Sequence, residues 1–479
     1  PSYTFFNALT TSNIQFSFTH TSSFDVQLPI IGGTADIFWG DGTIDTKVDP
    51  DAITAHTYAA GSYDAIVNIV GGSVTACGSD GWTGVDKLTG IFTTSTSDWE
   101  LGANVSSFAY LCKGASLITT TIPSQIPSTI TDMNNMFNGA STFNADISNW
   151  DTSSVTDMSN MFNGASAFTG DISGWTTSSV TDMNNMFNGA ELFDADISGW
   201  TTNSVTDMSS MFKDAIAFNK NLITSTNVWN TSSVTDMNNM FNGASVFTGD
   251  ISNWDTSSVT DMNNMFNGAS AFNADISGWT TIAVTDMNNM FNGASVLDQD
   301  LTHWNTGNVT SYTDMFSGAT QMINNQSAPV TPTSAYFNHF LTFSFTGVAS
   351  VTLPISSTGS LNVYIYWGDG SNQINYTSGT ISKTYTSSGN YDVTIWGDAT
   401  TFGSGSTAWT GADKLTTAST PDETTWNLTG LVSVSGMFNG TSILTSVPSY
   451  IPTGVTFMNN MFSASTFNGD ISNWDVSNV

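Results

Sequence analysis

Aspartates are the side chains best placed to do chemistry in this sequence, because they recur at fixed intervals. One series opens a short D-I-S-x-W motif or its D-L-T-x-W variant, at Asp146, Asp171, Asp196, Asp250, Asp275 and Asp300. A second series precedes an M-x-x-M-F motif in most repeats, at Asp132, Asp157, Asp182, Asp207, Asp236, Asp261 and Asp286. Such carboxylates either cap turns by accepting backbone N–H bonds or supply oxygen ligands to calcium. Capping is the simpler interpretation, and calcium bound by the first series is the alternative.

Motifs for catalysis are missing from the sequence. The four histidines, His20, His56, His303 and His339, are scattered, and no nucleophile elbow, zinc-binding helix or phosphate loop is present. A glycosidase needs one unique pair of carboxylates, whereas these carboxylates repeat. We therefore expect no enzymatic activity and no cofactor other than calcium. Cys77 and Cys112 could be two core thiols or one disulfide.

The charge balance excludes two classes of partner. The chain has 39 acidic residues against 7 basic ones, all of them lysine, and a net charge of -32. Nucleic-acid binding needs clustered Lys and Arg to neutralise phosphates, so we expect no nucleic-acid partner. No apolar run approaches the roughly 18 residues that a bilayer-spanning helix needs, so we expect no membrane insertion.

The spacing of the apolar residues predicts a solenoid. The M-x-x-M-F motif recurs mostly every 25 residues, and a tryptophan series keeps the same step. A unit of this length cannot bury its own apolar side chains, but stacked units can. The predicted core includes Met158, Met161, Phe162, Phe168, Ile172, Trp175, Met183, Met186, Phe187 and Trp200.

Two short elements are expected in each unit. The D-I-S-x-W segment predicts a strand, and these strands would form a parallel ladder. The V-T-D-M-N-N-M-F-N-G-A segment predicts one or two helical turns, because Met158, Met161 and Phe162 fall on one helical face and Asn163-Gly164 can end the helix.

The repeat resembles a known family. The stretch N-M-F-N-G-A-S-A-F-T-G-D-I-S-G-W-T-T-S-S-V-T-D-M, from Asn160 to Met183, is similar to the leucine-rich repeats of BspA-like bacterial surface proteins, also seen in mycoplasma-type surface lipoproteins. The resemblance implies an exposed, non-catalytic surface protein with a role in adhesion.

A second kind of module flanks the repeats. Trp39-Gly40-Asp41-Gly42 is followed by His56-Thr57-Tyr58, and the pattern returns as Trp367-Gly368-Asp369-Gly370 and Lys383-Thr384-Tyr385. These motifs resemble PKD-type immunoglobulin-like domains, and their alternating apolar positions predict antiparallel β-sandwiches.

The expected fold is therefore mixed and β-rich, with a leucine-rich-repeat-like solenoid alternating with PKD-like antiparallel β-sandwiches. We expect a sandwich at 1–75, a solenoid with atypical opening turns at 76–326, a second sandwich at 327–400, and the start of a second solenoid at 401–479. The second solenoid stops within a turn, so we expect the natural polypeptide to continue.

The expected function is surface adhesion or ligand presentation by a non-catalytic extracellular or cell-surface protein. The alternative is a structural subunit of an extracellular filament or fibre built from tandem sandwich-plus-solenoid units. The expected partners are other proteins, surface glycans, or copies of the chain itself.

Overall fold

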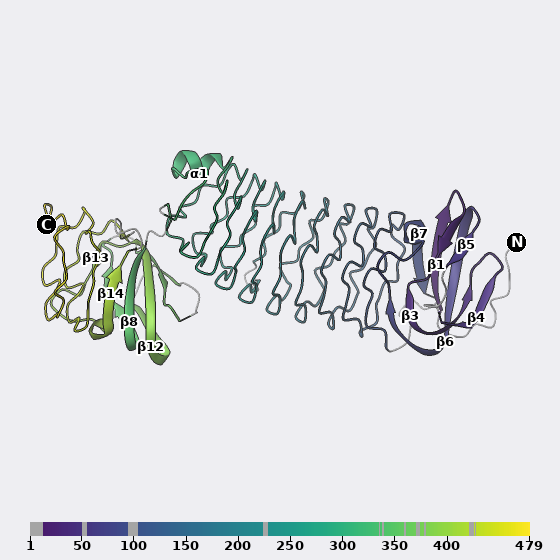
Figure 1. The fold of residues 1–479 in the computed structure, drawn as a ribbon, viewed down its shortest axis with the longest axis horizontal. Helices are drawn as coiled ribbons and strands as arrows, with labels where there is room; N and C mark the ends of the chain where they lie inside the picture. The colour runs from purple at the N-terminus through teal and green to yellow at the C-terminus, as the bar shows by residue number, and fades with distance from the viewer. Residues whose placement is uncertain are drawn as a thin grey trace.

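The protein is an elongated, β-rich molecule in which sheets and stacked turns alternate (Figure 1). The computed structural model describes residues 13–49, 55–93, 104–223, 229–334, 336–337, 340–358, 361–369, 374–377, 380–420, 426 and 428–479. Within these residues the α-helical content is the short helix α1 (Thr320–Asn325). No helix in this part of the chain is long and apolar enough to cross a membrane.

The N-terminal part is an antiparallel sheet with strand order β4-β3-β6-β1-β7. Its strands are β1 (Asn13–His20), β3 (Ile30–Phe38), β4 (Ile44–Val48), β6 (Gly61–Cys77) and β7 (Leu88–Thr93). A two-stranded sheet joins β2 (Phe24–Val26) to β5 (His56–Tyr58), and the 3-10 helix η2 (Val85–Lys87) precedes β7. The main sheet reaches past residue 75, where the sequence placed the end of the first domain.

The second sheet repeats this order as β11-β10-β12-β8-β14. Its strands are β8 (Leu341–Leu353), β10 (Asn362–Tyr366), β11 (Ile374–Tyr376), β12 (Ile381–Asp398) and β14 (Leu415–Ser419), and β15 (Leu428–Thr429) pairs in parallel with β12. The pair β9 (Ile355–Ser356) and β13 (Thr401–Phe402) lies beside it, and η3 (Ala412–Lys414) precedes β14 as η2 precedes β7. The motif repeat seen in the sequence is therefore a repeat of strand order as well.

Between the two sheets, the 25-residue units form stacked turns that we call the first coil, residues 104–319. Parallel β-bridges join successive turns through one column, which runs from Ala76 at the end of β6 through Ser107 and Asp132 to Ser311. The strand β6 therefore provides the edge on which the first turn is built. A shorter set of turns, the second coil (residues 430–479), begins in the same way from β13, where Thr401 bridges Ser433.

The predicted position of the ladder was wrong. The bridges pass through the aspartates of the T-D-M motif, such as Asp157 and Asp182, and the D-I-S-x-W segments form tight turns. In one of these turns the Trp175 N–H donates to the Ile172 carbonyl at 3.2 Å. The Asp171 carboxylate accepts the Ser173 N–H, which favours a turn over an extended strand.

The predicted helix at the T-D-M motif was also wrong. Asn160 and Gly164 have φ angles of 57° and 72°, and these left-handed residues interrupt any helix. The N–H groups of Met158, Asn160, Phe162 and Gly164 instead donate to carbonyls of the next turn, at 2.7 to 3.1 Å. The residues between them close four-residue turns, as when the Met161 N–H donates to the Met158 carbonyl. Along this segment, backbone N–H groups that bond to the next turn therefore alternate with N–H groups that bond within the same turn.

Identical side chains stack in columns inside the first coil. The rings of Trp175 and Trp200 lie parallel with centroids 6.5 Å apart, and those of Phe162 and Phe187 are 5.7 Å apart. One continuous apolar core runs from Ile14 in β1 to Phe337, and a second runs from Leu341 to Trp474. Each sheet therefore shares its core with the coil that follows it.

Truncating Met183 to alanine should loosen the coil locally. Met183 is fully buried, and removing such a side chain costs about 2 to 5 kcal/mol, with the low end expected because methionine packing adapts. Stability in stacked repeats comes from contacts between neighbours, so hydrogen exchange should accelerate in the turns next to residue 183. A uniform loss of protection across both coils would contradict this model.

Candidate functional site

The first aspartate series lies on the surface and caps the D-I-S-x-W turns. Asp146 Oδ1 accepts the Ser148 N–H at 3.0 Å and the Ser148 hydroxyl at 2.7 Å. These two bonds lower the pKa of Asp146 below its ordinary value. The other carboxylates of this series also accept the backbone N–H of the residue two positions later; they are Asp171, Asp196, Asp250, Asp275 and Asp300.

Repulsion along this column is outweighed by its local hydrogen bonds. Bonds from the Ser173 backbone and side chain lower the pKa of Asp171, although Asp146 and Asp196 in the adjacent turns act to raise it. Across the residues the structure describes, no group of three or more His, Cys, Asp or Glu side chains is arranged to hold a metal ion. The geometry therefore supports turn capping by these aspartates.

The second aspartate series is less accessible, and two of its members show a pKa shift in the opposite direction. Asp182 Oδ1 accepts the backbone and side-chain N–H groups of Asn184 at 2.9 and 2.6 Å. Burial nevertheless raises the pKa of Asp182 above its ordinary value, with the neighbouring Asp207 and Asp157 adding to the effect. Burial raises the pKa of Asp236 in the same manner. The stability contributed by Asp182 and Asp236 therefore responds to pH with the opposite sign to that contributed by Asp146 and Asp171.

The ten expected core residues all lie inside the first coil and are not available to a ligand. Eight of them have no exposed surface, and Trp175 and Trp200 are 4% and 1% exposed. The indole N–H groups of Trp175 and Trp200 donate to the carbonyls of Ile147 and Ile172 on the preceding turn, both at 3.1 Å. The tryptophan column therefore links turns by hydrogen bonds as well as by stacking.

A buried threonine column was missed from the sequence. Thr177 Oγ1 donates to the Thr201 carbonyl and accepts the Thr201 N–H, both at 2.9 Å, so one hydroxyl satisfies two backbone groups of the next turn. The sequence did carry a signal for this column, because a threonine recurs two residues after each tryptophan of the tryptophan column. The column consists of Thr152, Thr177, Thr202, Thr231, Thr256, Thr281 and Thr306, all about 99% buried or more.

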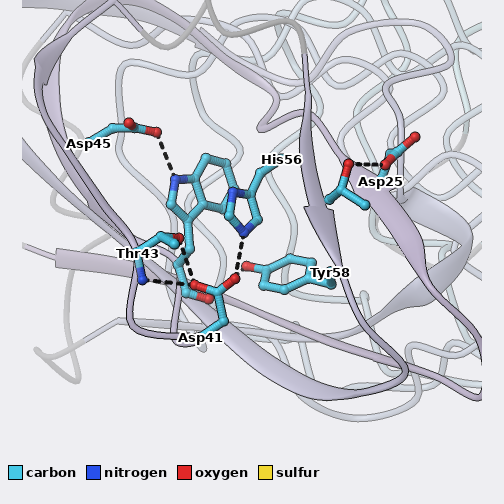
Figure 2. A network of polar contacts seen from close by, with 8 residues as sticks. Asp25, Asp41, Thr43, Asp45, His56 and Tyr58 are labelled. Carbon is cyan, nitrogen blue, oxygen red and sulfur yellow. Dashed lines mark hydrogen bonds and ion pairs between the residues drawn. The ribbon is translucent and has the colours of Figure 1, made fainter.

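The W-G-D-G motif of the first sheet builds a compact polar cluster (Figure 2). Asp41 accepts bonds from the Thr43 hydroxyl at 2.6 Å and from His56 at 2.9 Å, and His56 stacks on Trp39 with ring centroids 4.3 Å apart. Partial burial acts to raise the pKa of Asp41, but the bonds from Thr43 and His56 leave it below its ordinary value. Tyr58 donates its hydroxyl to the Trp39 carbonyl at 2.8 Å. Each polar group is thus used within the cluster.

The second sheet keeps this cluster with a different partner for its aspartate. Lys383 pairs with Asp369 at 2.6 Å, where His56 pairs with Asp41 in the first sheet, and Tyr385 donates to the Trp367 carbonyl at 3.0 Å. A histidine that lysine replaces opposite the same aspartate acts there as a hydrogen-bond donor, which favours a structural role. Of the other histidines, His20 packs against Phe24 and His303 stacks on Trp396, and His339 is outside the described residues.

Cys77 and Cys112 are both free and fully buried where β6 meets the first coil. Burial raises the pKa of both thiols, which keeps them protonated and weakly nucleophilic. The structure therefore places them as core thiols.

The free energy of unfolding should pass through a maximum near about pH 4. A raised folded-state pKa at Asp182 and Asp236 adds stability as the pH falls toward 4. A lowered folded-state pKa at Asp146, Asp171 and Asp196 makes stability fall below that pH. Urea unfolding followed by tryptophan fluorescence between pH 3 and 8 measures this profile.

Asp182→Asn and Asp171→Asn provide a matched pair for this profile. At pH 7, Asp182→Asn should raise the urea midpoint, because it removes a partly buried charge and retains an acceptor for Asn184. Asp171→Asn should leave the midpoint unchanged or lower it. The opposite ranking would contradict the assignment of the two columns.

Chelation should leave the melting temperature unchanged. The aspartates of the first series already accept local N–H bonds, so their turns do not require a cation. Thermal unfolding with and without EDTA, followed by addition of calcium chloride, tests this. A drop in melting temperature that calcium restores would favour the calcium alternative.

Comparison with known proteins gives one family. The family described as "Mycoplasma protein of unknown function, DUF285" matches residues 106–226, 222–328 and 406–479. No match was found among curated proteins or among solved structures. The matched spans cover most of the first coil and all of the second, and together more than half of the chain. The chain therefore belongs to the DUF285 family.

Proposed function

We propose that this chain is a non-catalytic extracellular or cell-surface protein that adheres to other molecules through the outer surface of its coils. Most of the repeated titratable groups described above are engaged in capping turns, and the repeated aromatic groups are buried in the core. We therefore assign binding to the side chains that the stacked turns expose along the length of the coils.

An exposed apolar column is the observation that carries this proposal. The position just before the buried phenylalanine column holds Leu117, Leu192, Val246 and Val296, and all four side chains are exposed, Leu192 by 56%. Exposed apolar side chains that recur at one position of a coil lie along one line on its surface. The intervening turns carry smaller or polar side chains at this position, so the row is interrupted; they are Thr142, Ala167, Ala217 and Ala271. A row of exposed apolar side chains on one face of a molecule favours a role in protein interaction.

The proposal also includes a specific fold type for the coils and for the sheets. We infer that the coils are leucine-rich-repeat-type solenoids of the BspA-like kind, in which methionine, phenylalanine and tryptophan replace leucine. The two sheets, with their W-G-D-G clusters, would be PKD-type modules. The stacked turns, the shared cores and the repeated strand order support this assignment, with the first module extending to Thr93.

Replacing the apolar column with serine should abolish adhesion and keep the fold. The natural chain already carries Thr142 at this position of one turn, so a hydroxyl side chain is tolerated there. The variant with Leu117, Leu192, Val246 and Val296 all changed to serine should bind immobilised collagen, laminin or mucin at least about tenfold more weakly than the natural chain. Its melting temperature should be unchanged. Equal binding by both chains, or no binding by the natural chain, would contradict the proposal.

The alternative function is a filament subunit, and the tandem arrangement favours it. The second sheet packs against the end of the first coil, where Trp396 stacks on His303 with ring centroids 5.2 Å apart. The same kind of contact between molecules would give head-to-tail polymers. Sedimentation velocity over a range of concentrations separates the two functions, because adhesion by a monomer predicts one concentration-independent species.

A further inference from the structure

The exposed apolar column of the first coil shares one face with the first aspartate series. Val246, Thr248 and Asp250 are exposed, and the two residues between them are buried. Such alternation places every second side chain of a segment on the same face. We call this surface the acidic face; it carries Leu192, Val246, Val296 and the aspartates of the first series.

The larger apolar side chains recur on alternate turns of this face. Leu192, Val246 and Val296 are exposed two turns apart, and alanines occupy the turns between them. Phe218 stacks on Phe247 with ring centroids 6.0 Å apart, so the turns stay in register across the four-residue insertion. Hydrogen-bonded turns lie about 4.8 Å apart, so these apolar side chains repeat about every 9 to 10 Å. The fourth member of the column lies three turns before Leu192.

Each of these apolar side chains has an exposed carboxylate on its own turn. Asp196, Asp250 and Asp300 follow them by four residues, which an extended chain spans in about 13 Å. Their Oδ1 atoms accept the capping N–H bonds, and their Oδ2 atoms accept no hydrogen bond from the described residues. Capping thus engages one oxygen and leaves the negative charge in place. Lys220, which lies beside this face, is already paired with Asp194 at 2.7 Å.

The charge of the acidic face selects the class of partner. A second copy of the chain, a nucleic acid or an anionic membrane would add negative charge to a chain that already carries -32. A partner with lysine or arginine beside its apolar side chains would instead relieve the repulsion along the aspartate column. An uncharged apolar ligand would meet only one of the two columns.

We propose that the acidic face binds a basic protein segment whose apolar side chains recur about every 9 to 10 Å. These side chains pack on Leu192, Val246 and Val296, and lysine or arginine side chains on one flank of the segment pair with the aspartates of the same turns. The proposal rests on the adhesive function and deepens it, because it states the chemistry of the partner that the coil surface binds.

The spacing restricts the conformation of the bound segment. Every third residue of a polyproline II segment recurs at about 9.3 Å, and every seventh residue of an α-helix recurs at about 10.5 Å. Alternate residues of a β-strand recur at only about 6.6 to 6.8 Å. A polyproline II segment or a helix therefore matches the alternate turns, and a strand lying along the coil does not.

Synthetic peptides test each requirement separately. One probe repeats Leu-Pro-Lys, and a second carries leucine at every seventh position of an alanine-based helix with lysine on its flank. Matched versions replace leucine by alanine or lysine by glutamate, and a further peptide alternates leucine and lysine as a strand would. Fluorescence anisotropy with labelled peptides and the full chain gives the dissociation constants at low and at high salt.

Two double variants of the protein make the same change in net charge at matched caps. Asp196→Asn with Asp250→Asn neutralises two carboxylates of the acidic face and keeps an acceptor for each capping bond. Asp151→Asn with Asp475→Asn makes the same change at two capping aspartates that lie beyond the D-I-S-x-W turn. The serine variant of the apolar column removes the apolar contacts, and thermal unfolding checks that every variant is folded.

At least one of the two spaced probes should bind the natural chain, and added salt should weaken its binding. The serine variant of the protein, and the alanine and glutamate versions of the peptide, should each bind at least about tenfold more weakly. Asp196→Asn with Asp250→Asn should weaken binding about fivefold, and Asp151→Asn with Asp475→Asn less than about twofold. The strand-patterned peptide should bind at least about fivefold more weakly than the spaced probe.

Failure of both spaced probes to bind would overturn the proposal. Equal binding of the glutamate peptide, equal binding by the serine variant, or equal effects of the two double variants would also overturn it. Adhesion to collagen, laminin or mucin that the serine variant loses, with no peptide bound by the natural chain, would reject the basic partner and leave the adhesive function standing. Peptide binding by a natural chain that adheres to none of the three would keep the binding face and reject the adhesive function.

Discussion

The backbone hydrogen bonds between successive turns set the register on which every column of the coil depends. Met158 bonds to Asp182, Asn160 to Asn184 and Phe162 to Met186, so each turn is held at one fixed offset from the next. Given that offset, identical residues must lie on top of one another. The tryptophan, phenylalanine and threonine columns follow from this register, and so does the like-charge stacking of the aspartates.

Left-handed backbone conformations make this register possible. Asn160 and Gly164 turn the chain back on itself within a few residues, and this frees alternate N–H groups to reach the neighbouring turn. Asparagine and glycine are the residues that enter this conformation at least cost. The same chain geometry places Met158, Met161 and Phe162 inside, which a helix would also have done, although the backbone is not helical.

Each sheet serves as the starting edge of a coil. The end of β6 bridges Ser107, and the apolar core of the first sheet continues into the turns without a break. The W-G-D-G cluster lies at the surface of each sheet and ties its turn to a strand through an Asp–His pair in the first copy and an Asp–Lys pair in the second. The second sheet in turn packs onto the end of the first coil, where Trp396 stacks on His303.

The sequence by itself determined the repeat, its inward-facing residues and the twofold recurrence of sheet and coil, because periodic apolar spacing and repeated motifs are local properties of the chain. It did not determine which segment carries the ladder. The D-I-S-x-W segment has strand-like composition but closes on itself through Asp171 and Ser173, whereas T-D-M has a helical spacing but bonds to its neighbour. Only the tertiary structure decided this. The hydrogen bonds between turns join residues about 25 positions apart, and they outweigh the local propensity of each segment. It also decided how the second sheet packs on the first coil, because His303 and Trp396 are far apart in the sequence and stack only when the two parts come together.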